Sequence, residues 1–379
     1  MLAGPQSAMR LGDLGADVIK VEPPQGEWCR SHTIADAYLE GESTPFVGLN
    51  RNKRGITINL KTDAGLQLMY KLVKHADVFL QNFRVGTVER LKIDYESLRQ
   101  INPRLIYCSI SGYGEQGPYR QRPGQDLILQ GYSGTLFSSG SKNDPPRPAP
   151  FYGPDVMTSY QACIAILGAL VARERIGVGQ KIEVSMFATM LDCQQQEILT
   201  YLNQGKLPPR TEEPLANAWI NAPYGIYGTK DHYITLAMAP LDVLGEALDN
   251  DRLREMKQWS DGATHRDEVY RICAEVLPSR TTAAWIEHFD KHNIWSGPVY
   301  SYDMLEKDPH VLATEMITEI PHPKIGKYRS PNVPVKMSET PMQIRRHAPL
   351  LGEHTAEVLR EVLDYDDAKI QSLRQQNAL

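Results

Sequence analysis

Two short acidic segments stand out for the chemistry they could support. Residues 124–126 read Gly-Gln-Asp, and residues 153–155 read Gly-Pro-Asp. Asp155 heads a long apolar stretch with helical spacing, which contains Val156, Tyr160, Cys163, Ile164, Leu167, Leu170 and Val171. We therefore predict a helix that begins at Asp155, with this side chain as its N-cap. The free N–H groups and the dipole at a helix start favour an ionised carboxylate.

An ionised carboxylate on a fixed turn supports two interpretations. The spacing alone favours a simple helix cap. In a site that excludes water, however, Asp155 could also attack an acyl group as a nucleophile. The Gln125 amide could donate a hydrogen bond to a carbonyl oxygen or an oxyanion, or it could only pack in its loop. Asp126 could orient a substrate or stabilise the loop that carries it.

The elements around these segments indicate an α/β fold. Strand-like stretches are separated by helical patterns, which is typical of βαβ units and a parallel sheet. We predict helices at 9–14 and 63–75, and strands at 17–21, 55–60, 76–80, 105–110 and 182–184. Ligands bind at the carboxyl ends of such strands, so the loops at 22–30, 82–90 and 111–126 are expected to line a site. The Gly- and Pro-rich residues 112–155 predict a functional loop over that site.

The length of 379 residues predicts two domains. We assign residues 1–203 to the first part of a large domain and residues 204–222 to a polar linker or lid. Residues 223–318 form a smaller α+β domain, with a hairpin at 224–235 and helices within 242–289. Residues 319–379 return to the large domain through short strands and a terminal helix.

Composition excludes several classes of protein. A net charge of −5 and a pI of about 6.1 argue against a nucleic-acid binder. The five cysteines have no metal-binding spacing, and we interpret them as reduced core residues of a cytoplasmic protein. The first residues do not read as a signal peptide, and no uncharged apolar run is long enough to span a membrane. We therefore expect no metal, no tightly bound cofactor and no membrane partner.

Several motifs, in order and at matching separations, resemble the class III CoA-transferase family of the CaiB/BaiF type, which includes α-methylacyl-CoA racemases. These motifs are residues 11–22 (LGDLGADVIKVE), 49–54 (LNRNKR), 82–87 (NFRVGT), 94–96 (DYE), 109–114 (SISGYG), 117–119 (GPY), 123–126 (PGQD) and 350–355 (LLGEHT). The resemblance implies a Rossmann-like large domain, a smaller domain and an interlocked homodimer. Family members begin with a strand before the Leu-Ala-Gly-Pro segment, so we expect that strand to be missing or very short here.

The resemblance assigns the catalytic roles. Asp155 matches the nucleophilic aspartate, which forms an acyl-aspartyl anhydride and then an aspartyl-CoA thioester before the acceptor carboxylate takes the CoA. The racemase branch has a histidine at the position of Gln125. Because glutamine cannot exchange a proton at neutral pH, Gln125 favours transfer over racemisation.

The resemblance also implies a CoA-binding set of residues: Ala3, Ile58, Lys61, Asn82, Phe83, Arg84, Arg90, Arg122, Gln125 and Asp126. Arginines suit the pyrophosphate and 3′-phosphate of CoA, and Phe83 suits adenine or pantetheine. Arg51 and Lys53 would add local positive charge, or they could only flank a strand. Pro23 stands where several members have an arginine, and Arg30 or Arg122 could replace that contact.

We therefore expect an enzyme that moves CoA from an acyl-CoA, such as the thioester of a dicarboxylate, to a carboxylic acid. Two alternatives are an acyl-CoA racemase or epimerase and a CoA-binding protein without turnover. Glycine-rich lids of formyl-CoA/oxalate members are not evident in residues 216–224, which argues against that substrate pair.

Overall fold

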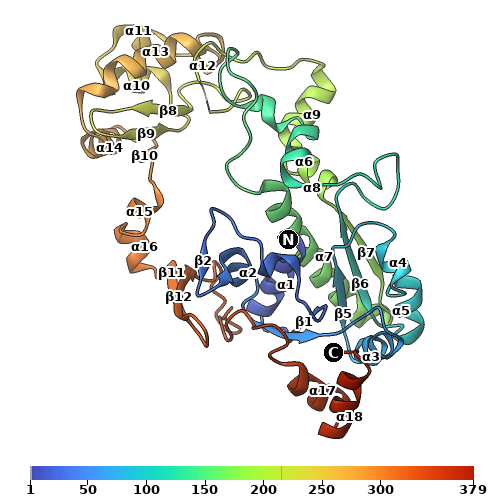
Figure 1. The fold of residues 1–379 in the computed structure, drawn as a ribbon. Coiled ribbons are helices and arrows are strands. Elements are labelled where there is room, and N and C mark those ends of the chain that lie inside the picture. The colour runs from blue at the N-terminus through green and yellow to red at the C-terminus, as the bar shows by residue number, and fades with distance from the viewer. Residues whose placement is uncertain (1, 215) are drawn as a thin grey trace. The chain divides into compact units, whose positions relative to one another are not determined.

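The computed structural model describes residues 2–214 and 216–379. Met1 and Leu215, which fall in the predicted first domain and the predicted linker, lie outside the described residues. The chain forms two compact units, each assembled from separate stretches of sequence. Unit 1 comprises residues 1–129, 152–190 and 309–379, and unit 2 comprises residues 130–151 and 191–308. Unit 1 thus contains both the blue and the red ends of the ribbon (Figure 1).

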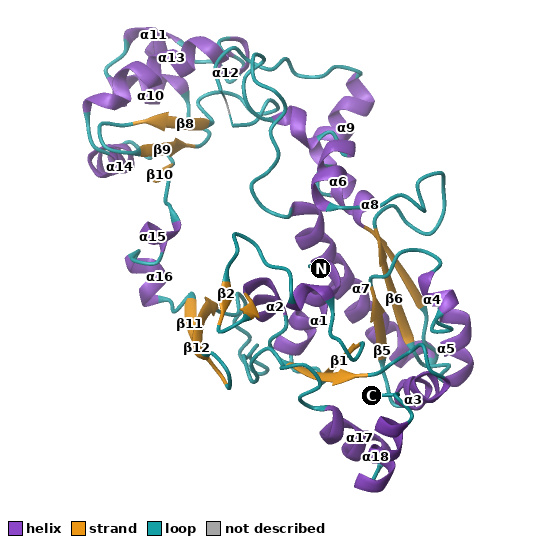
Figure 2. Ribbon diagram, viewed as in Figure 1, coloured by secondary structure: helices purple, strands orange, loops and turns teal. Residues whose placement is uncertain are grey.

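Unit 1 is a mixed α/β structure with two short parallel sheets (Figure 2). β1 (Val18–Glu22) pairs in parallel with β4 (Lys53–Thr57). β5 (Val78–Gln81), β6 (Ile106–Ser111) and β7 (Lys181–Ser185) form the second sheet, in that order. The central strand β6 is buried along its whole length, as expected for a strand with a neighbour on each side. The prediction of parallel strands separated by helices is confirmed, although the strand ends are shifted by a few residues.

Helices connect these strands. α3 (Asp63–Val73) follows β4, and the Thr62 hydroxyl caps its start by accepting a hydrogen bond from the Gly65 N–H at 3.1 Å. The other helices that lie wholly or partly in unit 1 are α1 (Ala3–Asp13), α2 (Thr44–Leu49), α4 (Thr87–Arg90), α5 (Tyr95–Ile101), α6 (Asp126–Tyr132), α7 (Gly153–Ile176), α8 (Met186–Asp192), α16 (Pro309–Ala313), α17 (Thr355–Leu363) and α18 (Asp367–Gln375). Because α6 lies within residues 112–155, the prediction of one continuous loop there is wrong.

The long helix α7 packs against the short helix α1. The Ser7 hydroxyl of α1 donates a hydrogen bond to the Ser159 carbonyl of α7 at 3.1 Å. α7 ends at Gly177, whose positive φ of 77° gives the chain its left-handed exit. The predicted helix at 9–14 is too short, because α1 already begins at Ala3. Its Gly4-Pro5 pair resembles a turn, but a proline is compatible with the first turn of a helix.

Two antiparallel hairpins complete unit 1. β2 (Tyr38–Leu39) pairs with β3 (Glu42–Ser43), and β11 (Ile317–His322) pairs with β12 (Gly326–Pro331). The short strands that we predicted beyond residue 319 are therefore present.

Unit 2 is built on a three-stranded antiparallel sheet. Its strands β8 (Gly225–Gly228), β9 (Tyr233–Leu236) and β10 (Ser296–Pro298) lie in the order β10-β9-β8, and the predicted hairpin at 224–235 is confirmed. Its helices are α9 (Gln195–Gln204), α10 (Leu241–Leu248), α11 (Asp251–Glu255), α12 (Asp261–Thr264), α13 (Arg266–Val276), α14 (Thr282–Lys291) and α15 (Tyr302–Leu305). Tyr227, Trp285 and Phe289 lie in the core.

One cysteine differs from the sequence prediction. Cys29, Cys108, Cys163 and Cys273 are buried, but Cys193 is exposed. Cys193 lies at the break between α8 and α9, where the helical pattern is interrupted. The interpretation of Cys193 as a core residue is therefore wrong.

Residues 50–54 form a buried junction that fixes both ends of α1. The Asp13 carboxylate, at the end of α1, accepts hydrogen bonds from Arg51 at 2.8 and 3.0 Å and from the Asn52 amide at 2.8 Å. The Lys53 ammonium donates to the Pro5 carbonyl in the first turn of α1, at 2.7 Å. Arg51 and Lys53 are buried against these partners, and β4 begins at Lys53, which agrees with the alternative that these residues flank a strand.

The same junction connects the C-terminal part of unit 1 to its N-terminal part. The side-chain oxygen of Asn52 accepts hydrogen bonds from the backbone N–H of Arg345 at 2.6 Å and from the backbone N–H of Arg346 at 3.0 Å. The Asn52 N–H in turn donates to the Arg346 carbonyl at 3.0 Å. Arg54 pairs with Glu357 and Glu361 on α17. The segment from 343 to 361 is therefore held by residues from the first sixth of the chain.

We expect Asp13→Ala to lower the free energy of unfolding by about 3–5 kcal/mol, because it leaves the buried Arg51 guanidinium without its charged partner. Urea unfolding followed by circular dichroism measures the change. Glu96→Ala is the control, because its pair with Arg99 is exposed and should contribute only about 0.2–1 kcal/mol. Equal effects of the two substitutions would contradict a structural role for the junction.

Candidate active site

Asp155 lies in the first turn of α7 and does not cap that helix. α7 begins at Gly153, and the residue before it, Tyr152, makes no side-chain cap. The predicted helix start and the predicted N-cap role of Asp155 are therefore wrong. The reason is Pro154, which is compatible with the first helical turn and lets the helix begin two residues earlier.

The Asp155 carboxylate instead binds the start of another helix. Its Oδ1 accepts a hydrogen bond from the Ala3 N–H, the first of α1, at 3.1 Å. That N–H has no partner within an α-helix, and the helix dipole favours a negative charge beside it. Asp155 therefore caps α1, and the two helices meet at this carboxylate.

Asp126 caps the start of α7 in the same way. Its Oδ2 accepts a hydrogen bond from the Asp155 N–H at 3.2 Å, and Asp126 is only 5% exposed. Asp126 is itself the first residue of α6. The starts of α1, α6 and α7 thus converge, and the two predicted acidic segments are brought into direct contact.

The electrostatic surroundings of Asp155 oppose its ionisation. Burial raises the pKa of Asp155 above its ordinary value, the hydrogen bond from the Ala3 N–H opposes that rise, and the nearby charge of Asp126 adds to it. A carboxylate that is less hydrated than usual is a better nucleophile than one in bulk water, because it has less solvent to shed.

The loop after β5 reaches the same place. A Cβ added to Gly4, the residue after Ala3, would lie 3.2 Å from the Asn82 Cβ. The Asn82 amide donates to the Ile110 carbonyl near the end of β6 at 2.9 Å. Ala3, Asn82, Asp126 and Asp155 therefore cluster around the carboxyl ends of β5 and β6, where the sequence predicted a site.

Sequence reasoning missed a residue that orders this loop. The Gln81 side chain donates to the Ser109 hydroxyl at 2.8 Å and accepts from the Phe83 N–H at 2.7 Å. Gln81 therefore links the end of β5 to its neighbour and fixes the turn that exposes Phe83. The available signal was a polar residue at the end of an otherwise apolar strand.

Of the predicted CoA-binding arginines, Arg84 and Arg122 lie on loops and Arg90 is the last residue of α4. Arg84, Arg90 and Arg122 are exposed, and Phe83 is 45% exposed. Arg90 donates to the Thr87 hydroxyl at 3.1 Å, and the Arg122 guanidinium lies 4.2 Å from the centre of the Tyr119 ring. Gln125 is also exposed, directly before the buried Asp126. Exposed guanidinium groups of this kind remain accessible to phosphate.

The other residues predicted to contact CoA differ in how accessible their side chains are. The Ile58 side chain is buried in a hydrophobic cluster with α3, α17 and α18, so only its backbone could meet a ligand. Lys61 is exposed before α3. Arg30 is engaged, because it donates twice to Glu22 at 2.8 Å and lies 3.8 Å from the Phe46 ring centre. Arg30 thus already has protein partners, and the expectation that Arg30 or Arg122 replaces an arginine at position 23 stays a prediction.

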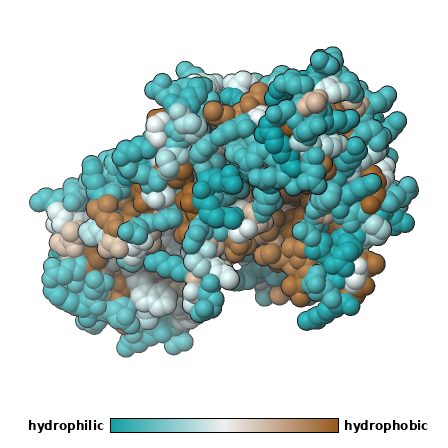
Figure 3. Space-filling view, turned by 90° about the horizontal axis from the view of Figure 1, so that it is seen from below, coloured by the Kyte–Doolittle hydropathy of each residue, from teal (hydrophilic) through white to brown (hydrophobic). Residues whose placement is uncertain are grey.

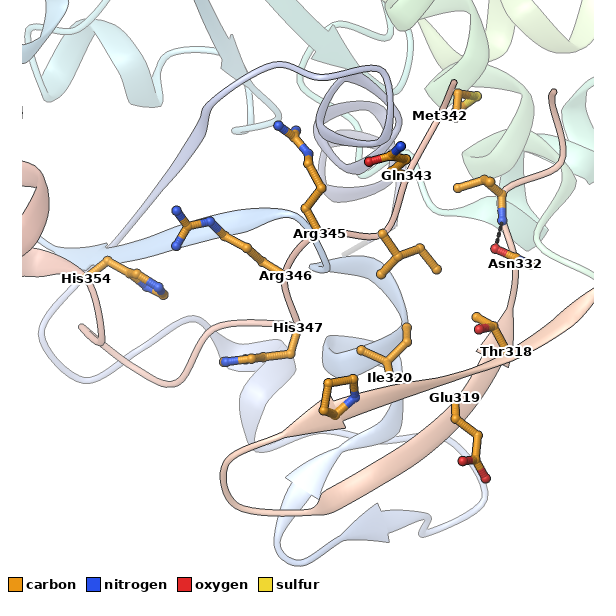
Figure 4. Close-up of a pocket in the computed structure, with 13 residues that line it drawn as sticks. Thr318, Glu319, Ile320, Asn332, Met342, Gln343, Arg345, Arg346, His347 and His354 are labelled. Atoms are coloured by element: carbon orange, nitrogen blue, oxygen red, sulfur yellow. Dashed lines mark hydrogen bonds between the residues drawn. The ribbon is translucent and has the colours of Figure 1, made fainter. Parts of the chain in front are cut away.

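A cavity of about 560 Å³ lies elsewhere in unit 1, beside the β11–β12 hairpin. It is lined by Thr318, Arg345, Arg346, His347 and His354 among others (Figure 4). The Arg345 guanidinium donates to the Gly12 carbonyl at 2.7 Å and so closes the end of α1. None of the predicted site residues lines this cavity. Among the described residues, no group of three or more His, Cys, Asp or Glu is placed to hold a metal ion.

We expect Asp155→Asn to stabilise the protein at pH 7–8 by about 0.5–2 kcal/mol, since it removes a partly desolvated charge but keeps an oxygen for the Ala3 N–H. The pKa of Asp155 is raised in the folded state, so the cost of its ionisation is present above that folded pKa. The gain should therefore shrink as the pH falls toward 4. Denaturant unfolding between pH 4 and 8 measures it, and a variant less stable than wild type at pH 8 would contradict the assignment.

Comparisons with known proteins show which family the chain belongs to. Residues 1–355 match the model of CoA-transferase family III. The succinyl-CoA:glutarate CoA-transferase of Homo sapiens is 32% identical, over 98% of this chain and 86% of that protein. The β subunit of the succinyl-CoA–L-malate CoA-transferase of Chloroflexus aurantiacus is 32% identical, over 100% of this chain and 95% of that protein.

A solved structure shows the same architecture. The crystal structure of a CaiB/BaiF family protein from Brucella suis superposes with a TM-score of 0.83 at 31% identity, over 95% of this chain and 96% of that one. The match extends over the segments that carry Ala3, Asp126 and Asp155. The chain belongs to CoA-transferase family III and is a class III CoA-transferase.

Proposed function

We propose that this enzyme moves CoA from a dicarboxylate thioester to a second carboxylic acid, with Asp155 as the nucleophile. One observation carries the assignment of the nucleophile. The Asp155 carboxylate is partly desolvated, and among the described residues it accepts one hydrogen bond, from the N–H at the start of α1. Its second oxygen is the atom that would attack a thioester carbonyl.

In the proposed reaction, each step forms one bond and breaks another. The free Asp155 oxygen attacks the thioester carbonyl, the carbon–sulfur bond breaks, and an acyl-aspartyl anhydride and a CoA thiolate form. The thiolate attacks the Asp155 carbonyl and releases the first acid as its carboxylate. The acceptor carboxylate then attacks the carbonyl of the aspartyl thioester, which expels the CoA thiolate and gives a mixed anhydride. The thiolate attacks the acceptor carbonyl of this anhydride, which forms the new thioester and frees the Asp155 carboxylate.

The Ala3 N–H suits the steps that occur at the Asp155 carbonyl. When the thiolate attacks that carbon, negative charge develops on Oδ1, the atom to which the Ala3 N–H already donates at 3.1 Å. A donor in place before the reaction needs no reorganisation as the charge forms. The dipole of the 11-residue helix α1 acts in the same direction.

CoA transfer fits this site better than racemisation, which requires proton exchange at the α-carbon of the acyl group. Gln125, which precedes the buried Asp126, has no ionisable proton at neutral pH. Gln125 therefore does not supply the second base that a racemase needs.

We propose that Phe83, Arg84, Arg90 and Arg122 bind CoA, together with the backbone around Ala3, Ile58, Lys61 and Asn82. The three arginines are exposed; Arg84 follows Asn82 by two residues, and Arg122 precedes Asp126 by four. Guanidinium groups bind phosphate in a bidentate manner, and an exposed ring offers a surface for adenine. A dicarboxylate as donor is supported by the names of the similar succinyl-CoA transferases.

Asp155→Ala should lower turnover by roughly 10³-fold or more, because no covalent intermediate can form. The half-reaction is measured with succinyl-CoA and hydroxylamine, which traps an activated Asp155 as its hydroxamate for peptide mass spectrometry and releases free CoA. Glu96→Ala is a matched carboxylate control that should retain full labelling at Asp155.

Two outcomes would contradict this proposal. One is unchanged turnover of Asp155→Ala. The other is exchange of the α-hydrogen of a branched acyl-CoA with deuterated water, without any CoA transfer, which would indicate a racemase. Calorimetric CoA binding without transfer to any acid of a broad panel would indicate a binding protein.

We also propose that the enzyme is a homodimer that uses the open face of α7. Met157, Tyr160, Ile164, Leu167 and Val171 are each 38–63% exposed and follow one another at alternating spacings of three and four residues. That spacing is typical of a seam between packed helices. Apolar side chains also reach the surface in the space-filling view (Figure 3). α7 is, among the described residues, the one helix long and apolar enough to cross a membrane, so a lipid surface is the alternative.

Ile164→Glu combined with Val171→Glu should convert the dimer to a monomer, because two charges would be placed in an apolar seam. Size-exclusion chromatography with light scattering measures the mass, and Glu174→Lys at the exposed end of the same helix is the control. A wild-type monomer that binds phosphatidylcholine vesicles would contradict the proposal and favour a membrane surface.

A reducing compartment such as the cytoplasm suits the cysteines. No disulfide links them among the described residues, and burial raises the pKa of Cys29 to about 11 and of Cys108 to about 12. Thiols with raised pKa values are poor nucleophiles, so they take no part in the proposed chemistry.

A further inference from the structure

Gly112 and Gly124 lie backbone against backbone. A Cβ placed on Gly124 would lie 2.4 Å from the Gly112 Cα, and a Cβ placed on Gly112 would lie 2.6 Å from the Gly124 Cα. Side chains do not tolerate contacts this short with a backbone atom. Neither glycine has a positive φ, so the requirement for glycine is one of space alone.

Each glycine is fixed to a different part of the site. Gly112 follows the last residue of β6, and its carbonyl accepts the Phe187 N–H, from the start of α8, at 2.9 Å. Gly124 precedes Gln125 and Asp126. The Gln125 carbonyl accepts the Leu129 N–H at 3.0 Å, and the Leu129 side chain is fully buried. The contact between the glycines therefore joins the end of the sheet to the start of α6.

Asp126 extends this connection to the nucleophile. Its carboxylate accepts the Asp155 N–H at 3.2 Å. We propose that the Gly112–Gly124 contact is a positioning element for CoA transfer, which sets Asp126 at the distance that orients Asp155. This inference rests on the proposed function of Asp155.

A methyl group at either glycine must move one backbone away from the other. Displacements of about 1 Å in an active site can lower rates by roughly a hundredfold. Arg84 and Arg90, which we assign to CoA, lie outside the loop of Gly124, and the nearby Arg122 is fixed by its N–H, which donates to the Tyr119 carbonyl at 2.8 Å, so binding of the thioester should change little. We therefore expect kcat to fall about tenfold to a hundredfold in Gly124→Ala, with a KM for succinyl-CoA within about threefold of wild type.

The experiment compares full-length Gly124→Ala and Gly112→Ala with Gly179→Ala. Gly179 is also packed tightly against a backbone atom, because a Cβ there would lie 2.1 Å from the Leu105 carbonyl oxygen. This contact lies before the start of β6 and β7, at the ends of these strands that are opposite to the site. Gly179→Ala should lower stability but leave kcat of the folded enzyme unchanged. The half-reaction with succinyl-CoA and hydroxylamine gives the rate without knowledge of the acceptor acid.

Hydrogen exchange reports the geometry directly. Because the Asp155 N–H is bonded to Asp126, it should exchange faster in Gly124→Ala. The Val156 N–H should not change, since it donates within α7 to the Tyr152 carbonyl at 2.9 Å. A general loss of stability would affect both amides, whereas loss of positioning affects only the first.

Two results would overturn the proposal: a wild-type half-reaction rate in Gly124→Ala, or unchanged exchange of the Asp155 amide. Should neither alanine variant fold, Asp126→Ala decides, because a wild-type rate there would also refute positioning through Asp126. These outcomes are distinct from failure of the proposed function. That failure would appear as turnover in Asp155→Ala, whatever the glycine variants show.

Discussion

The structure of unit 1 depends on one carboxylate that lies between two helix starts. Asp155 belongs to α7 but binds the first N–H of α1, so the helices must meet at a fixed distance and angle. The remaining contacts between them keep that geometry. Ser7 bonds the Ser159 carbonyl, and Lys53 holds the Pro5 carbonyl in the same turn of α1. A group that must be both poorly hydrated and correctly aimed is stabilised by neighbours on every side.

This arrangement explains why stability and chemistry conflict at Asp155. Burial makes the ionised form costly, and the nearby Asp126 adds a like charge. A protein built only for stability would place an amide or an apolar residue there. The helix dipole and one hydrogen bond reduce the cost without saturating the carboxylate, which leaves an oxygen able to react.

Local sequence patterns predicted the elements well and the contacts poorly. Periodicity gave the parallel strands and α3, because their burial repeats along the chain. It misplaced the starts of α1 and α7, where Pro5 and Pro154 resemble turns but fit a first helical turn. It also assigned the wrong helix to the Asp155 cap and did not reveal that Lys53 is buried. The partners of both residues, Ala3 and Pro5, are distant in sequence, so no local pattern could reveal them. The motif that carried the resemblance did, however, bring Asp126 and Asp155 together.

The junction at residues 50–54 has a consequence for how the chain is made. Asn52 and Arg54 need partners at 345, 346, 357 and 361, which are synthesised 293 or more residues after them. During synthesis Arg54 therefore has Asp17 as a partner but not yet Glu357 or Glu361. The junction can close only after these partners have emerged from the ribosome, so its assembly is a late event in the folding of unit 1.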